Sequence, residues 1–120
     1  MKKNKYQLLI FPMAQLDMEQ IFDYISFKLL NPTAAIGLIN DFEKAFDNIC
    51  TFPESCPYIN NEYVKDKSLR KLVVNNYIAF YRVRDNEIQV VRVLYGMCNY
   101  EDFLWKILWK KIFMLSSLQY

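Results

Sequence analysis

Hydrophobic and polar residues alternate through the second half of the chain in a pattern typical of three short β-strands. This half divides into LRKLVV, YIAFYRV and EIQVVRVLY, which are separated by Asn75-Asn76 and by Asp85-Asn86. Asn and Asp tolerate the positive φ that two-residue hairpin loops require, so each pair predicts a tight turn between antiparallel strands. Gly96 ends the third strand.

A helical period replaces this alternation in the first half of the chain. Apolar residues recur at i, i+4, i+7 and i+8 over about 14–29, which predicts an amphipathic helix. Asn31 is a good N-cap and Pro32 suits the first helical position, so a second helix is expected to begin there and to end before Pro53. The short join between the two segments predicts an antiparallel helical hairpin.

Three flanking segments complete the expected organisation. Residues 5–11, KYQLLIF, predict a short strand that Pro12 ends, and the polar residues 58–68 predict a loop. The tail from Tyr100 to Leu115 has helical periodicity with little polar surface.

The hairpin turns also predict which side chains share a face of the sheet. Both faces are mostly apolar, so we expect the helical hairpin to cover one and the tail helix or a partner to cover the other. Arg70 is expected opposite Tyr81 and Arg92 opposite Ala79. One face is expected to carry Arg70, Leu72, Val74, Tyr77, Ala79, Tyr81, Val83, Ile88, Val90, Arg92 and Leu94. The other is expected to carry Leu69, Lys71, Val73, Ile78, Phe80, Arg82, Gln89, Val91, Val93 and Tyr95.

Arginines among apolar neighbours need partners, because an unpaired charge is costly to bury. The acidic residues of the predicted helices can supply them, so structural ion pairs with Asp17, Asp41 or Glu43 are expected. A direct functional role for the arginines stays open beside this structural one.

Composition narrows the chemistry that is open to the chain. Its 120 residues predict one domain, and the absence of His with only two Gly argues against a Ser-His-Asp site, most zinc sites and Gly-rich phosphate loops. No metal and no cofactor is expected. Cys50, Cys56 and Cys98 lack C-x-x-C spacing and predict free thiols in a reducing cytoplasm. No signal peptide and no membrane-spanning run is expected. With a net charge of only +2, the chain is not expected to have the broad basic surface of a non-specific nucleic-acid binder.

Four local sequences, met in order, resemble the recurrent pattern of the RelE/ParE superfamily of type II toxin–antitoxin toxins. They are FDYISFKLLNP with the following Ala34-Ala35, the Leu69-Arg70 pair, NYIAFYRV and VVRVLYG. The resemblance covers residues 5–104 and implies an α+β fold. That fold has an N-terminal strand, an antiparallel helical hairpin and a three- to four-stranded antiparallel sheet. An apolar, Lys-bearing tail, residues 105–120, follows as a C-terminal helical extension.

The resemblance implies a small cytoplasmic toxin of a bacterial plasmid-stabilisation or addiction module, linked to the stress response. It implies a cognate antitoxin that binds through an amphipathic helix, and it leaves a homodimer open. RelE-like members cleave mRNA in the ribosomal decoding site, whereas ParE-like members poison DNA gyrase.

The residues that RelE-like RNases use are mostly replaced in this chain. Those enzymes use clustered Lys and Arg with a Tyr to activate the ribose hydroxyl and to stabilise the charged phosphorane. Lys71 matches the Lys of the second strand, but Leu69, Ile78 and Cys98 occupy three positions that are basic in the RNases. The C-terminal Tyr has no match, because Tyr100 falls four residues short.

These replacements favour a non-hydrolytic, ParE-like gyrase inhibitor. One alternative is a ribosome-dependent mRNA endoribonuclease with Lys71, Arg82 and Tyr100 as its catalytic residues. Another is an attenuated toxin that only binds its antitoxin. The residues expected to bind the target or the antitoxin are Arg70, Tyr81, Arg92 and Tyr95.

Overall fold

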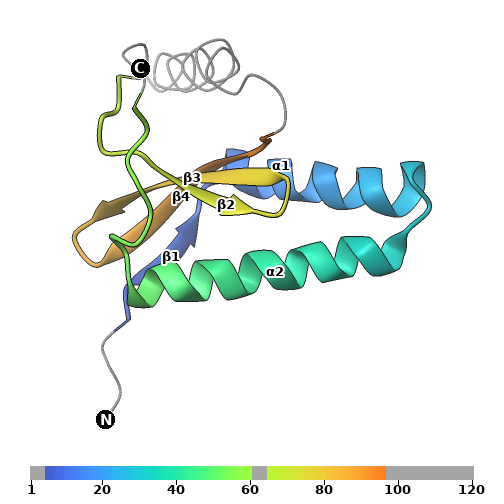
Figure 1. Cartoon of the computed structure of the whole chain (residues 1–120), viewed down its shortest axis with the longest axis horizontal. Coiled ribbons are helices and arrows are strands. Elements are labelled where there is room, and N and C mark those ends of the chain that lie inside the picture. Colours follow the sequence, from blue (N-terminus) through green and yellow to red (C-terminus); the bar gives the residue numbers. More distant parts are fainter. Residues whose placement is uncertain (1–4, 61–64, 97–120) are drawn as a thin grey trace.

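The computed structural model describes residues 5–60 and 65–96, which form two helices and a four-stranded sheet (Figure 1). The predicted tail helix and Tyr100 lie outside these residues. The order of the strands in the sheet is β1-β4-β3-β2. The elements are β1 (Gln7–Ile10), α1 (Pro12–Asp23), the π-helical turn η1 (Tyr24–Lys28), α2 (Pro32–Thr51), β2 (Arg70–Val74), β3 (Tyr77–Arg84) and β4 (Glu87–Tyr95).

The sheet is mixed. β2, β3 and β4 form the predicted antiparallel meander, and β1 adds to β4 in parallel, from Gln7 opposite Glu87 to Ile10 opposite Val90. The α+β prediction is confirmed. The strand pattern alone could not show that the N-terminal strand joins in parallel, because that depends on how the two helices return the chain to the sheet.

Local sequence signals set the ends of several elements as predicted. Asn75 and Asp85, the first residues of the two hairpin turns, both have φ of 53°. Asn31 caps α2, because its side-chain oxygen accepts a hydrogen bond from the Ala34 amide at 3.1 Å, and Pro32 follows in the first helical position. β4 ends at Tyr95, directly before Gly96.

The predicted pairing of β3 with β4 is right near the turn and wrong farther from it. Tyr81 pairs with Val90 as expected, but a β-bulge follows and Phe80 pairs with Arg92. Arg92 therefore lies opposite Phe80, and the expectation that it faces Ala79 is wrong. Both faces of β4 are apolar, so a one-residue shift leaves the hydrophobic pattern unchanged and the sequence does not reveal the bulge.

The bulge exchanges the faces of the last residues of β4. Val93 now pairs with Ala79 and packs in the core beneath the helices, whereas Leu94 packs in the cluster on the other face. Tyr95 pairs with Tyr77, which brings it toward the helical hairpin. The predicted faces of Val93, Leu94 and Tyr95 are therefore wrong, whereas the faces predicted closer to the turn agree with the two clusters.

Two apolar clusters pack on the two opposite faces of the sheet. The larger one joins the helices to the sheet and includes Phe42, Phe46 and Ile49 of α2 with Tyr81 and Val90 of the sheet. The smaller one lies on the other face and consists of Ile59, Leu69, Ile78, Phe80, Val91 and Leu94, with Phe11 packed against it. The loop before β2 supplies Ile59 and Leu69, so part of the cover that we expected from the tail or a partner comes from this loop.

The tip of the helical hairpin exposes several apolar side chains. The π-helical turn η1 leads into Leu30, which has φ of 54° and is 82% exposed. The Asn31 amide donates to the Ile25 carbonyl across this join. A Leu in the left-handed region is strained, because its Cβ approaches the neighbouring backbone.

Candidate functional site

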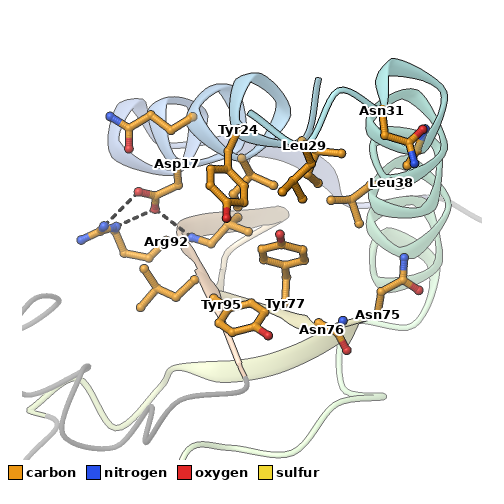
Figure 2. Close-up of a pocket in the computed structure, with 16 residues that line it drawn as sticks. Asp17, Tyr24, Leu29, Asn31, Leu38, Asn75, Asn76, Tyr77, Arg92 and Tyr95 are labelled. Atoms are coloured by element: carbon orange, nitrogen blue, oxygen red, sulfur yellow. Dashed lines mark hydrogen bonds and ion pairs between the residues drawn. The ribbon is translucent and has the colours of Figure 1, made fainter. Parts of the chain in front are cut away.

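A cavity of about 1020 Å³ opens between the helical hairpin and the end of the sheet (Figure 2). Ile21, Ile25 and Leu29 line it from the first helix and its π-helical end, and Leu38 lines it from α2. The hairpin turn of β2 and β3 borders it with Asn75 and Asn76. The Asn75 amide also donates to Asp41 of α2 at 2.9 Å, which ties that turn to the helix.

Tyrosines from three elements gather in this cavity. Tyr77 and Tyr95 meet at an edge-to-face angle with 5.6 Å between ring centroids, and Tyr24 approaches from the helical side (Figure 2). Tyr24 is 53% and Tyr95 49% exposed, whereas Tyr77 is half-buried. Burial raises the pKa of Tyr77, and the neighbouring Tyr95 and Tyr24 raise it further. The cavity thus offers an aromatic surface that carries phenol groups.

A buried ion pair closes one end of the cavity. Arg92 of β4 donates from Nε and Nη2 to Asp17 of α1 at 2.6 and 2.9 Å, and the Val93 amide donates to the same carboxylate at 2.9 Å. The expected structural ion pair with Asp17 is confirmed. Both side chains are almost fully buried, so the ion pair joins α1 to β4. It leaves the Arg92 side chain little freedom to contact another protein.

Two of the residues expected to bind a partner, Tyr81 and Arg70, form hydrogen bonds with the loop before β2. The Tyr81 side chain is fully buried, and its hydroxyl donates to the Pro53 carbonyl at 2.9 Å. Burial raises the pKa of Tyr81 far above its usual value, and contact with Cys56 adds to the shift. Arg70 donates to the Cys56 carbonyl at 2.6 Å, and its guanidinium lies 3.8 Å from the centre of the Tyr58 ring.

Two of the residues expected to act in an RNase, Lys71 and Arg82, lie on the other side of the sheet from the cavity, and the third, Tyr100, is outside the described residues. Lys71 is half-buried in β2 and pairs with Phe80. Arg82 donates to Asp66 at 2.7 Å and to Gln89 at 2.8 Å. Burial raises the pKa of Asp66, but hydrogen bonds from Ser68 and Arg82, with the charge of Arg82, outweigh burial and lower it below its usual value.

The predicted binding residues therefore do not form one site. Arg92 and Tyr95 border the cavity, whereas Arg70 and Tyr81 hold the loop. The sequence analysis missed Tyr24, which contributes the helical side of the cavity. Its place beside the apolar stripe of the first helix was the signal that could have identified it.

Within residues 5–60 and 65–96, no group of acidic residues and cysteines is arranged to hold a metal ion. In the same part of the chain, no helix is long and apolar enough to cross a membrane. Cys50 and Cys56 are both free thiols, as expected.

The family of the ParE toxin of the type II toxin–antitoxin system parDE matches residues 9–100. The chain belongs to this family. Its match begins in β1 and includes both helices and all three strands of the meander, so it covers the cavity and both faces of the sheet.

Solved structures of toxin–antitoxin systems share the fold of this ParE-family chain. A chromosomal ParDE system from P. aeruginosa aligns with a TM-score of 0.61 at 19% identity, over 78% of this chain and 98% of the other. The RelBE2 toxin–antitoxin complex from Mycobacterium tuberculosis aligns with a TM-score of 0.53 at 17% identity, over 76% and 98%. At such identities the likeness shows the fold alone. No curated protein matches the chain.

Proposed function

We propose that this ParE-family toxin acts without hydrolysis, by binding DNA gyrase in the cytoplasm. The observation that carries the proposal is the burial of Leu69 and Ile78 in one apolar cluster. Both are at positions that are basic in RelE-like RNases, yet here they are 1% and 5% exposed and pack with Phe80.

The surroundings of Lys71 also support a toxin that acts without hydrolysis. An RNase of the RelE type needs several positive groups around one phosphate, and loss of one such donor commonly lowers the rate by roughly 10²–10³. Here Arg82 is already bound to Asp66 and Gln89, and apolar side chains replace two further donors. Among the matched RNase positions in the described residues, only Lys71 keeps a basic side chain that could stabilise the negative charge of the transition state.

The cavity between the helices and the sheet is the surface that we propose for the antitoxin. The two related structures named above are toxin–antitoxin systems, one of them described as a complex. An amphipathic helix of the antitoxin would place apolar side chains against Leu29 and Leu38 and cover the rings of Tyr24 and Tyr95.

The target can be tested with two assays on the purified protein. We expect inhibition of DNA supercoiling by gyrase, and no codon-specific cleavage of mRNA on programmed ribosomes. Lys71→Ala should leave the gyrase inhibition unchanged. Robust mRNA cleavage that Lys71→Ala abolishes would instead establish the endoribonuclease alternative, and inactivity in both assays would favour an attenuated toxin.

The antitoxin surface can be tested with matched substitutions. Tyr24→Ser and Tyr95→Ser should each weaken the affinity for the antitoxin encoded beside the toxin gene. Val73→Ser is the control, because Val73 is 63% exposed and is not among the residues that line the cavity. Equal affinities for all three variants, measured by calorimetry, would exclude the cavity as the binding surface.

A further inference from the structure

The two edges of the sheet differ in how their backbone groups are used. On the β2 edge, the Lys71 amide donates to the Pro57 carbonyl and the Ile59 amide donates to the Leu69 carbonyl, so the loop before β2 covers much of that edge. On the β1 edge, the Tyr6 amide donates outward to the Cys50 carbonyl at 2.9 Å. Beyond Tyr6, no strand among the described residues pairs with the outward side of β1, which is an edge of the sheet.

The pairing of β1 with β4 shows which backbone groups point outward. The amides of Gln7 and Phe11 donate to β4 and its preceding turn, so the odd residues face the sheet and the even residues face away from it. The outward groups are therefore the amides and carbonyls of Leu8 and Ile10. Leu8 and Leu9 are also 42% and 43% exposed, and Gln7–Ile10 contains neither a charge nor a Pro that would discourage strand pairing.

We propose that β1 is a dimerisation edge, on which β1 of a second copy pairs in the antiparallel sense. The outward backbone groups of Leu8 and Ile10 are placed symmetrically about Leu9. The amide and carbonyl of Leu8 would therefore form hydrogen bonds with the carbonyl and amide of Ile10 in the second copy. By symmetry, the amide and carbonyl of Ile10 would form the same two hydrogen bonds with Leu8 of the second copy. Leu9 would lie opposite Leu9 of the second copy in a pair without backbone hydrogen bonds, and the two sheets would become continuous.

The charged and apolar side chains near β1 are compatible with antiparallel pairing to a second copy. Lys5 is held by Asp47 of its own chain at 2.6 Å, and the pairing places Gln7 opposite Phe11, so no like charges meet. Leu9 projects from the same face as Gln89, its neighbour in β4. The exposed surface of two leucines would then be buried at the symmetry axis. This dimer is independent of the gyrase target and uses a different surface from the cavity.

Cysteine cross-linking tests the register directly. Residues opposite each other in a pair without hydrogen bonds have Cα atoms about 4.5 Å apart, which suits a disulfide. Leu9→Cys should therefore give a disulfide dimer under mild oxidation, identified by mass spectrometry as a link between two copies of position 9. Leu8→Cys is the matched control, because two copies of position 8 would be displaced along the strands and too far apart to link.

The oligomeric state of unmodified protein gives a second test. Sedimentation should show a concentration-dependent dimer, and Leu9→Lys should weaken it at least tenfold while circular dichroism and thermal unfolding show a folded chain. A monomer at all concentrations, equal cross-linking at positions 8 and 9, or a dimer that Leu9→Lys does not weaken would each overturn the proposal.

Discussion

Arg92 and Asp17, which are 75 residues apart in the chain, form a buried two-bond ion pair that joins β4 to α1. The carboxylate also accepts the Val93 amide, so one side chain satisfies three N–H donors from the two residues directly after the bulge. We expect Asp17→Leu to destabilise the fold by about 3–5 kcal/mol, because it leaves the Arg92 charge buried and unpaired. Urea unfolding measures the change. The double variant Asp17→Leu with Arg92→Met should recover much of the loss, and an equal or larger loss would contradict this account.

The two glycines should respond in opposite ways to replacement by Ala. A Cβ on Gly37 of α2 would meet no atom within 4 Å, so Gly37→Ala should stabilise the protein by about 1 kcal/mol through helix propensity. A Cβ on Gly96 would lie 2.9 Å from Cγ1 of the buried Ile78, so Gly96→Ala should cost about 1–3 kcal/mol. Chemical unfolding of both variants checks the signs.

Leu30 has a left-handed backbone that costs about 1–2 kcal/mol for a residue with a Cβ. Because its side chain is largely exposed, little burial is lost on truncation. Leu30→Gly should therefore raise the free energy of unfolding by about 1 kcal/mol. Leu30→Ala keeps the Cβ and should change it by only a few tenths. Equal effects of the two variants would show that the side chain, not the backbone, sets the stability at this position.

The Tyr81 hydroxyl should stabilise the fold at neutral pH and lose this effect in alkali. Tyr81→Phe removes the bond to Pro53 and should cost about 1 kcal/mol at pH 7. The pKa of Tyr81 is raised in the folded state, so its contribution is complete below the unfolded pKa of about 10 and falls as the pH rises above it. The difference between wild type and variant should therefore shrink above about pH 10. A constant difference would contradict the burial argument.

Asp66 should make the fold sensitive to acid. Its pKa is lowered in the folded state, so its contribution is complete above the unfolded pKa of about 4 and is lost as the pH falls through the folded value. Asp66→Asn should cost about 1 kcal/mol at pH 7, because it breaks the pair with Arg82. The cost should disappear toward pH 2. Thermal unfolding from pH 2 to 7 measures it, with Asp85→Asn in the exposed turn as the control.

The sequence by itself determined the features that depend on neighbours along the chain. Asn75 and Asp85 place the turns because few residue types accept their φ, and Asn31 with Pro32 starts α2 because the cap needs only the first helical turn. The ion pair of Asp17 was also expected, because the arginines of an apolar sheet need acidic partners. These signals act over a few residues or follow from charge.

Only the tertiary structure decided the features that depend on how distant elements meet. The parallel addition of β1 follows from the return path of the helices, and the bulge opposite Phe80 is invisible where both faces of a strand are apolar. That bulge brings Tyr95 to Tyr77 and so makes the aromatic wall of the cavity. Alternation of side chains fixes a face only while the register holds, so one extra residue in β4 decided which side chains border the cavity.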